Sequence, residues 1–510
     1  MNTYYITTPI YYINDKPHIG HAYATTISDI FARYHRMKGE DTFFLTGTDE
    51  NSLKNVEAAE KSGMGEKISE YLDAQSAIWK QTWKELGMSH DDFIRTTEDR
   101  HHIGVTKFIQ LVQHNGDIYK GTYVGYYCVG CEEFVRKTDV INGVCPIHKK
   151  PLKEISEDNY FFAVSKYRQK LLDHIGLHPD FIQPETKKNE VVNFITHHME
   201  DFSVSRQNSR YGIPFPGDST HVVYVWFDAL INYLTGIGYG ANEELFEKFW
   251  PAEMHIVGKE IIKFHCAYWP AMLMSAGLPL PKKVFAHGHF TINGEKISKS
   301  LGNAIDPLDI AKKYGIDGLR YFLAREIPFG ADGDFSFSRL EERYMADLAK
   351  GLGNFTSRVA TMAAKEYDAS TPVAHDSDVV KAIEQAWNDW TAAMEGYSPE
   401  HALNALWNLI SFGDKYIEHQ KPWALSKDDQ KRYTIVIRSL VEVLRHISVM
   451  VSPFMPVTAE KIWSQLGIAE AQRTLSIEQS RALDAVEIKR ITKGASLFPP
   501  FDENAMKHRA

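Results

Sequence analysis

The sequence predicts an α/β protein built on a doubly wound parallel sheet and followed by an all-helical C-terminal part. Three observations support this prediction. Strand and helix patterns alternate near the N-terminus, a cysteine-rich stretch interrupts the sheet pattern, and helical periodicity dominates beyond residue 338. A chain of 510 residues exceeds what one hydrophobic core usually organises, so we expect several domains.

The N-terminal pattern is that of a strand, loop, helix and strand. Residues 4–10 form a buried apolar run, apolar residues at helical spacing then continue to Gly39, and residues 42–46 form a second run. Such units build parallel sheets whose ligands bind beyond the carboxyl ends of the strands. We therefore expect chemistry at the first loop.

Strand patterns return after the cysteine-rich stretch. Runs rich in β-branched and aromatic residues predict strands at residues 221–227, 254–257 and 284–292, and the dipeptide Asn293-Gly294 predicts a hairpin turn after the last of them. Together these patterns divide the chain. We predict that residues 1–117 and 221–337 are the two halves of the sheet domain, residues 118–220 an insertion, and residues 338–510 a helix bundle.

Two shorter signals concern the C-terminal half. Asp306 followed by Pro307 predicts the start of a helix, because aspartate caps helix N-termini and proline suits the first turn. Leu403, Leu406 and Ile410 share one helical face, as expected in a bundle.

Composition favours a globular protein without a membrane segment. Hydrophobic residues make up 44% of the chain and charged residues 24%, as in ordinary soluble domains. No apolar run is long enough to cross a bilayer, and the start of the chain does not resemble a secretory signal, so we expect a cytoplasmic protein. The net charge of −9 argues against a protein that coats nucleic acid nonspecifically.

The cysteine-rich stretch predicts a metal site within residues 128–148. Cys128 and Cys131, then Cys145 and His148, have the paired spacing of a closed tetrahedral zinc knuckle. Because four protein ligands leave no open position, we expect one structural zinc per chain rather than a catalytic one. The alternative is a reduced cysteine cluster without metal. Cys266 stands alone and is expected to be a small buried hydrophobic residue.

The first loop ends in His18-Ile19-Gly20-His21 and leads directly into a helix. The amides and dipole of a helix N-terminus favour negative charge, glycine permits close approach of a ligand, and histidines donate hydrogen bonds to phosphate oxygens. Alone the motif is weak, since histidines often simply cap helices.

A second short motif lies far downstream, at residues 296–300. Lys296-Ile297-Ser298-Lys299-Ser300 follows the predicted hairpin and places two ammonium groups on a loop. A solvated basic loop is the ordinary interpretation of such a pentamer.

Together these two loops resemble the two signatures of class I aminoacyl-tRNA synthetases, although Ile297 replaces the methionine common in that family. The resemblance implies that the histidines stabilise the triphosphate of ATP and that the lysines neutralise departing pyrophosphate, with Mg²⁺ accompanying ATP. An amino-acid carboxylate is already ionised at neutral pH, so the reaction needs positive charge rather than a general base. The implied catalytic residues are His18, His21, Lys296 and Lys299, and the implied ATP-binding residues are Gly20, Gly258, Lys296, Ser298 and Lys299.

Three further blocks, at residues 47–50, 224–233 and 258–270, resemble methionyl-tRNA synthetases in particular. A thioether has no charge, so its selection relies on shape and on contacts of sulfur with aromatic rings. Without the resemblance we would assign these aromatic residues to the core. The resemblance implies that Asp49 holds the α-ammonium and that the pocket for L-methionine is walled by Ile10, Tyr12, Trp226, Ala229, Tyr233, Phe264, His265 and Trp269.

The chain departs from the family pattern at two places. Asn51-Ser52 stands where the family usually continues with histidine and glycine, and Glu260 replaces a common aspartate. Neither departure removes a residue named above. They bear on finer contacts to adenosine or to the amino group.

The helical half carries elements similar to the anticodon-binding residues of the same family. Asn354 and Arg358 lie four positions apart on one predicted helix face, and Trp423 follows Pro422 at a loop or helix start. The resemblance implies that Trp423 stacks on a base of tRNA(Met) while Asn354 and Arg358 bond base edges. The alternative is a buried tryptophan and a surface arginine.

The resemblance as a whole implies a methionine–tRNA ligase with a Rossmann-like catalytic sheet, an inserted zinc-knuckle domain and an α-helical anticodon-binding domain. We expect a monomer, because only a few residues follow the bundle where some family members append a dimerising module. Two other classes stay open: a small-molecule nucleotidyltransferase or adenylate-forming ligase, and a nonenzymatic zinc-knuckle protein that binds nucleic acid.

Overall fold

In the computed structural model, the residues described are 2–128, 133–135, 140, 143–145, 150–207, 211–292, 295–296, 304–367, 374–488 and 490–500. They fall into two units. Residues 2–17 and 41–288 form one, which we call the sheet unit. Residues 18–40 and 289–510 belong to the other, which we call the helical unit.

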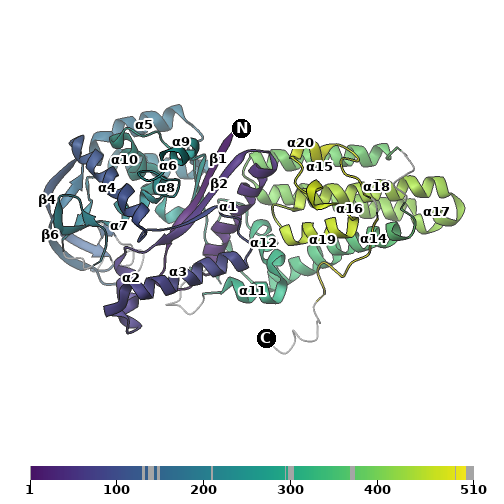
Figure 1. Ribbon diagram of the computed structural model, residues 1–510, viewed down its shortest axis with the longest axis horizontal. Helices are drawn as coiled ribbons and strands as arrows, with labels where there is room; N and C mark the ends of the chain where they lie inside the picture. The colour runs from purple at the N-terminus through teal and green to yellow at the C-terminus, as the bar shows by residue number, and fades with distance from the viewer. Residues whose placement is uncertain are drawn as a thin grey trace. The chain divides into compact units, whose positions relative to one another are not determined.

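The sheet unit contains the predicted parallel sheet, and Figure 1 shows its long strands β1 and β2 side by side. The strands run in the order β3 (Asp92–Arg95), β2 (Asp41–Asp49), β1 (Thr3–Tyr12), β12 (Met254–Gly258), β13 (Val284–His287) and β7 (Ile182–Gln183). All neighbouring pairs are parallel. The chain order reverses between β1 and β12, which is the point where such sheets bind ligands.

Two of the strand predictions are wrong in detail. Residues 221–227 were expected to be one strand, but β11 (Asp218–Val223) ends before Tyr224 and the helix α7 (Val225–Leu230) begins. A short buried apolar run fits a strand and a helix equally well, so periodicity alone does not separate them. Residues 284–292 divide into β13 and β14 (Phe290–Ile292), because β13 joins the six-stranded sheet whereas β14 joins a separate one.

The predicted hairpin is confirmed by the pairing of β14 with β15 (Glu295–Lys296) in antiparallel register. Its turn residues Asn293 and Gly294 lie outside the described residues. β14 also pairs with β16 (Gly333–Asp334). These three short strands belong to the helical unit.

The inserted segment forms its own antiparallel sheet within the sheet unit. The strands are β5 (Glu133–Val135), β4 (Ile118–Cys128), β6 (Lys153–Phe162) and β8 (Phe202–Ser203), in that order. The long pairing of β4 with β6 makes this sheet a hairpin with short strands at either side.

The helical unit is dominated by long helices, as the periodicity predicts. Figure 1 shows α15, α16, α18 and α19 side by side. The helix predicted at Asp306 is α11 (Pro307–Tyr314), and the Asp306 side chain accepts a hydrogen bond from the Leu308 N–H at 2.8 Å. The main helices of the bundle are α14 (Asn354–Glu366), α15 (Ser377–Glu395), α16 (Pro399–Gln420), α18 (Gln430–Val451) and α19 (Pro456–Leu466). None of the helices within the described ranges is both long and apolar enough to span a bilayer.

The helix α1 (Ile19–Met37) packs within the helical unit through a buried arginine. Arg320 on α12 (Ile316–Arg325) is 1% exposed and donates to Asp29 of α1 at 2.6 Å and to the Phe454 carbonyl at 2.8 Å. Tyr34 of α1 donates to Glu395 of α15 at 2.6 Å. The first long helix of the chain is therefore fixed by residues from its second half.

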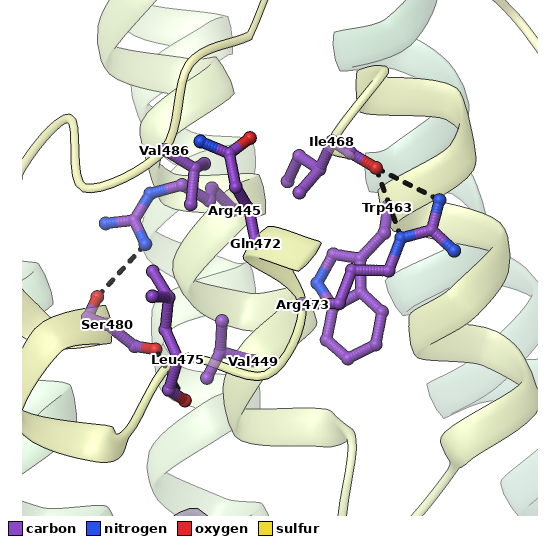
Figure 2. Close-up of a pocket in the computed structure, with 9 residues that line it drawn as sticks. All are labelled: Arg445, Val449, Trp463, Ile468, Gln472, Arg473, Leu475, Ser480 and Val486. Carbon is purple, nitrogen blue, oxygen red and sulfur yellow. Dashed lines mark hydrogen bonds between the residues drawn. The ribbon is translucent and has the colours of Figure 1, made fainter. Parts of the chain in front are cut away.

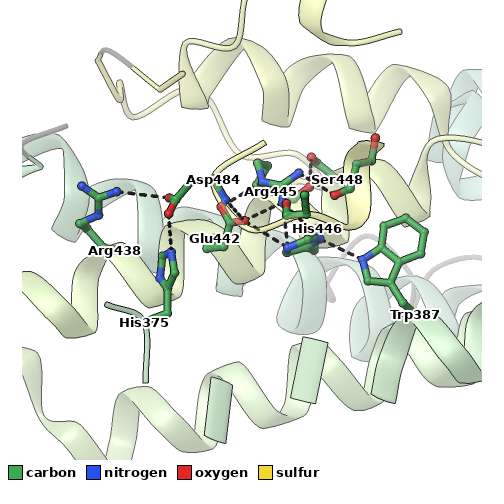
Figure 3. Close-up of polar contacts among 10 residues, drawn as sticks. His375, Trp387, Arg438, Glu442, Arg445, His446, Ser448 and Asp484 are labelled. Carbon is green, nitrogen blue, oxygen red and sulfur yellow. Dashed lines mark hydrogen bonds and ion pairs between the residues drawn. The ribbon is translucent and has the colours of Figure 1, made fainter. Parts of the chain in front are cut away.

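A buried polar cluster fastens the C-terminal segment to the bundle (Figure 3). Arg445 donates to Glu442 at 2.6 and 2.9 Å and to the carbonyls of Ser480 and Ala482. Trp387 of α15 donates to His446 Nδ1 at 2.9 Å. Burial opposes ionisation of Glu442, but hydrogen bonds from His446 and Arg445 outweigh it and hold the pKa of this carboxyl below its ordinary value.

Candidate functional site

The start of α1 is shaped by the two histidines predicted to matter. His18 is the N-cap, and its Nδ1 accepts a hydrogen bond from the Gly20 N–H at 3.1 Å. His21 Nδ1 accepts from the His18 N–H at 3.2 Å, and the two rings stack with centroids 3.7 Å apart. Because each Nδ1 accepts, each neutral ring carries its proton on Nε2. The helix start thus holds two oriented imidazole donors at its positive end.

Gly20 permits this arrangement. A Cβ at Gly20 would lie 3.0 Å from Cε1 and 3.2 Å from Nδ1 of the His18 ring. A side chain here would push the ring away from the helix start. The absence of a side chain at Gly20 therefore keeps the His18 ring in place, in addition to permitting the close approach of a ligand that the sequence predicts.

The flanks of the lysine loop both reach α1. Lys296 pairs with Thr291 on β14, and the neighbouring Phe290 ring packs on Tyr23 of α1 with centroids 4.9 Å apart. On the other side, the Ile305 carbonyl accepts a hydrogen bond from the Ile19 N–H at 3.0 Å. Ser298 and Lys299 lie outside the described residues. The described residues on both sides of this loop therefore contact the first turns of α1, the end that carries the histidines.

Gly258, the other predicted ATP-binding glycine, ends β12 in the sheet unit. A Cβ on Gly258 would lie 2.6 Å from a carboxylate oxygen of Glu260. The glycine therefore lets Glu260, one of the two departures from the family pattern, fold back over the end of the strand.

The residues predicted to wall a pocket come together in the sheet unit. Trp226 of α7 stacks on Phe264 with ring centroids 3.8 Å apart and planes 5° apart. Tyr233 and Trp269 are buried, with ring centroids 6.1 Å apart. The indole N–H groups of Trp226 and Trp269 are buried and have no hydrogen-bond partner among the residues that the structure describes. Donors of this kind suit a site that receives a ligand or water.

Part of this wall is a π-helix, which the sequence did not reveal. Phe264–Tyr268 forms it, followed directly by α10 (Trp269–Ala276). π-helical turns occur frequently at functional sites. Cys266 within it is fully buried, as predicted, and burial raises the pKa of its thiol.

Hydrogen bonds fix the protonation of His265. Its Nδ1 lies 3.0 Å from the Ile261 carbonyl, which can only accept, so Nδ1 carries the proton. Nε2 then accepts from the Tyr233 hydroxyl at 2.7 Å. Burial lowers the pKa of His265 to about 4, while the bond to the Ile261 carbonyl works in the opposite direction. The imidazole is therefore neutral and its tautomer is set by its neighbours.

Ile10, Tyr12 and Asp49 lie at the carboxyl ends of two central strands. Ile10 and Tyr12 are on β1, and Tyr12 pairs in register with Asp49, the last residue of β2. Asp49 is 3% exposed, and its carbonyl accepts from the Asn55 side chain at 2.8 Å. Lys54 lies over the Tyr12 ring at 4.1 Å from the centroid.

Asp49 is followed by a strongly anchored acid. Glu50 is fully buried, and its two oxygens accept from Arg95 at 2.8 and 2.9 Å. Thr48 and Thr97 donate to the same carboxylate at 2.7 and 2.6 Å. Burial opposes the charge of Arg95, but the hydrogen bonds and charge of Glu50 outweigh it and raise the pKa of Arg95.

Three residues that sequence reasoning did not assign form a second buried cluster beside Asp49. His101 Nε2 lies 2.6 Å from one carboxylate oxygen of Asp228, and the Asn51 side chain donates to the other at 2.8 Å. Asp228 lies in the block 224–233 that resembles methionyl-tRNA synthetases, and Asn51 departs from the pattern of that family. The sequence alone assigns no function to either residue. His101 had no sequence signal, because its partner is far away in the chain.

Two of the four predicted zinc ligands are described, and both are buried. Cys128 ends β4 and is 2% exposed, and Cys145 is 1% exposed. The Cys145 N–H donates to the Lys150 carbonyl at 2.9 Å. Cys131 and His148 lie outside the described residues. Among described residues, no group of three or more metal-ligating side chains is found.

The predicted anticodon residues lie in the helical unit. Trp423, near the start of α17 (Pro422–Asp428), is 52% exposed, so the alternative of a buried core tryptophan is wrong. Asn354 begins α14 and is exposed. Arg358 donates to Asp414 at 2.9 Å and to Glu418, both on α16, which leads through Lys421 to Trp423. Glu418, a partner of Arg358, lies five positions before Trp423 in the chain.

The helical unit also contains a small pocket, which is not a candidate substrate site. It is lined by residues such as Arg445, Trp463 and Arg473 (Figure 2). Its interior is only about as large as one water molecule. It is too small for a nucleotide or an amino acid.

Comparison with known proteins points to a single family. The family model described as tRNA synthetases class I (M) matches residues 4–155 and 135–360. The model described as the anticodon-binding domain of tRNA ligase matches residues 376–494.

Individual relatives carry one function in their names. The chain is 45% identical to a methionine–tRNA ligase of Caldanaerobacter subterraneus subsp. tengcongensis, over 98% of this chain and 79% of that protein. It is 41% identical to one of Streptomyces coelicolor, over 98% of this chain and 97% of that protein. A solved Mycobacterium tuberculosis methionyl-tRNA synthetase in complex with methionyl-adenylate is similar with a TM-score of 0.93 and 38% identity, covering 98% of this chain and 100% of that one.

The hydrogen bonds of His265 predict how this side chain behaves in solution. Since its folded-state pKa is lowered to about 4, the imidazole should stay neutral, with its proton on Nδ1, from pH 5.5 to pH 8.5. Long-range ¹H–¹⁵N NMR of labelled histidine measures both properties, and free imidazole in the same buffer is the control. Ring nitrogens of His265 that shift with a midpoint near pH 6.5 would contradict the assignment.

Proposed function

The chain belongs to the methionine–tRNA ligases, which are class I aminoacyl-tRNA synthetases, and from this premise we propose which residues carry each part of the reaction. The enzyme activates L-methionine with ATP to methionyl-adenylate, releasing pyrophosphate, and transfers methionine to tRNA(Met). This excludes the two other classes that the sequence left open. The observation that carries the residue assignment is the histidine-flanked start of α1 with both flanks of the lysine loop beside it.

Activation needs positive charge where the triphosphate lies. The methionine carboxylate is ionised at neutral pH and attacks the α-phosphorus directly, while pyrophosphate leaves. His18 and His21, held by main-chain hydrogen bonds with Nε2 as donor, stabilise the charge that develops on the phosphate oxygens. Gly20 keeps the His18 ring in place and leaves room for a phosphate at the helix start.

The lysine loop completes the ATP site. Lys296, Ser298 and Lys299 bind the β- and γ-phosphates and neutralise pyrophosphate as it leaves. Support comes from the contacts of Phe290 and Ile305 with α1, because these described residues precede and follow the loop in the chain. Gly258 is also among the proposed ATP-binding residues, and Mg²⁺ would accompany ATP and shield its phosphates.

The aromatic cluster of the sheet unit selects the methionine side chain. Trp226, Phe264 and Trp269 supply aromatic surfaces for the thioether and its methyl group. The other walls are Ile10, Tyr12, Ala229, Tyr233 and His265. A neutral His265 suits this site, because a buried imidazolium beside an uncharged thioether would have no counter-charge.

Asp49 holds the α-ammonium of methionine. Its position at the carboxyl end of β2, beside the switch point of the sheet, supports this role. The anchoring of Glu50 by Arg95 fixes the main chain immediately after it.

One structural zinc ion is bound by Cys128, Cys131, Cys145 and His148. The burial of Cys128 and Cys145 supports this proposal, since a thiolate pair shielded from water suits zinc. When bound, the ion would brace the loops at the end of the β4 and β6 hairpin. It takes no part in the chemistry.

The helical unit reads the anticodon. Trp423 stacks on a base, and Asn354 and Arg358 bond base edges. The exposure of Trp423 supports the first role. The ion pairs of Arg358 with Asp414 and Glu418 support the second, because they hold the guanidinium at the surface near Trp423.

We also propose domain boundaries at residues 117/118, 220/221 and 337/338, a monomeric state and a cytoplasmic location. Sedimentation of the purified chain measures the oligomeric state directly.

The amino-acid assignment predicts that only methionine supports exchange of labelled pyrophosphate into ATP. Each of the twenty amino acids is tested in turn with the purified chain, and a reaction without amino acid is the control. Exchange that proceeds equally without an amino acid, or with leucine or valine in place of methionine, would overturn the assignment.

The anticodon assignment predicts that Trp423→Ala lowers kcat/KM for aminoacylation of tRNA(Met) by about 10-fold or more, since one base loses its stacking partner. Methionine-dependent pyrophosphate exchange should change by less than about two-fold, because the activation site is untouched. Phe337→Ala, at another half-exposed aromatic residue of the helical unit, is the matched control. Equal losses in both assays would mean that Trp423 is structural.

The metal assignment predicts one zinc per chain in the purified protein and none in Cys145→Ser. Metal content is measured by plasma mass spectrometry, and thermal unfolding reports whether the variant loses stability with its metal. Cys266→Ser is the matched control, a buried cysteine outside the knuckle whose loss should leave the zinc content unchanged. A full zinc content in Cys145→Ser is incompatible with the proposed ligand set.

A further inference from the structure

The cluster formed by Asn51, Asp228 and His101 lies between the two ends of the proposed methionine site. Asn51 follows Asp49 by two positions on the loop after β2, and Asp228 lies between Trp226 and Ala229 on α7. The Asn51 side chain donates to Asp228 at 2.8 Å. One hydrogen bond thus joins the loop that carries the ammonium-binding residue to the helix that carries the side-chain wall.

The contacts around this bond make it rigid. Asn51 uses its second side-chain hydrogen on the Thr96 carbonyl at 3.1 Å, which ties it to the end of β3. The other oxygen of Asp228 accepts from His101 Nε2 at 2.6 Å, and His101 Nδ1 contacts the Thr235 hydroxyl at 2.8 Å. Each of these partners comes from a different element of the sheet unit.

Burial makes the bond costly to lose. Asp228 and His101 are 0% exposed and Asn51 is 8% exposed. A buried carboxylate oxygen without a donor, or a buried carbonyl without one, is destabilised far more than the same group in water. The loop and the helix are therefore held at one separation, because any slippage would leave the Asp228 carboxylate unsatisfied.

We propose that the Asn51–Asp228 pair is a positioning and specificity-determining device, which fixes the distance between Asp49 and the Trp226–Ala229 wall to fit an amino acid of the length of methionine. The inference rests on the proposed roles of Asp49, Trp226 and Ala229. Neither Asn51 nor Asp228 needs to touch the substrate. This also gives the departure at Asn51 a function, since its amide supplies the donor that Asp228 requires.

The test separates binding of methionine from binding of ATP. In Asn51→Ala, the KM for methionine in pyrophosphate exchange should rise by about 10-fold or more, as expected when buried partners are left unsatisfied near a site. The KM for ATP should stay within about two-fold. The preference for methionine over ethionine, which is one methylene longer, should fall by about five-fold, because the wall is no longer held at a fixed distance.

Two further variants keep the result interpretable. Asp228→Asn preserves the size of the side chain but cannot accept from both His101 and Asn51 in the same way, so it should reproduce both changes even if Asn51→Ala does not fold. Asn159→Ala is the matched control. Asn159 is 2% exposed and donates to the Glu157 carboxylate at 3.3 Å, in the inserted sheet of the same unit. It should lose stability without a change in methionine KM or selectivity.

The measurements distinguish a positioning role of the Asn51–Asp228 pair from a purely structural one. A lower thermal midpoint in Asn51→Ala and Asp228→Asn with unchanged methionine KM and unchanged ethionine discrimination would overturn the proposal, because the pair would then be only structural. The same kinetic changes in Asn159→Ala would also overturn it. A wild-type chain without methionine-dependent exchange would instead show that the proposed function fails.

Discussion

The carboxyl edge of the parallel sheet depends on buried carboxylates whose oxygens are all hydrogen bonded. Glu50 is held by Arg95 and two threonines, and Asp228 by His101 and Asn51. A charge removed from water is tolerated only when its hydrogen bonds are replaced in full, so these groups specify one arrangement of the loops around them. Of the residues proposed to bind methionine, Asp49, Trp226 and Ala229 lie within two positions of these anchors.

The start of α1 and the aromatic cluster of the sheet unit differ in their electrostatic character. At the start of α1, imidazole donors and the helix dipole create a region that favours negative charge. In the aromatic cluster, His265 is neutral, because it has a lowered pKa and accepts from Tyr233. The first region suits the proposed binding of phosphate, and the second suits the proposed selection of an uncharged side chain.

Much of the fold and part of the site could be predicted from the sequence, because local signals were consistent with tertiary structure. The strands β1, β2 and β12 follow from the strand patterns, the cap at Asp306 from capping preferences, and the burial of Cys266 from its isolation from the other cysteines. The break within residues 221–227 was missed, since a buried apolar run suits a helix as well as a strand.

Other features of the site could not be predicted, because local sequence patterns do not indicate them. The bond between His101 and Asp228 joins residues far apart in the chain, and no local pattern indicates that they pair. The π-helix at Phe264–Tyr268 depends on packing rather than on composition.

The buried pairing of α1 also has a consequence for biosynthesis. The helix α1 leaves the ribosome early, but Arg320, which pairs with Asp29 of α1, follows roughly 15–60 seconds later at typical elongation rates. The nascent helix that begins at His18 and His21 must therefore wait for the second half of the polypeptide before this buried ion pair can form.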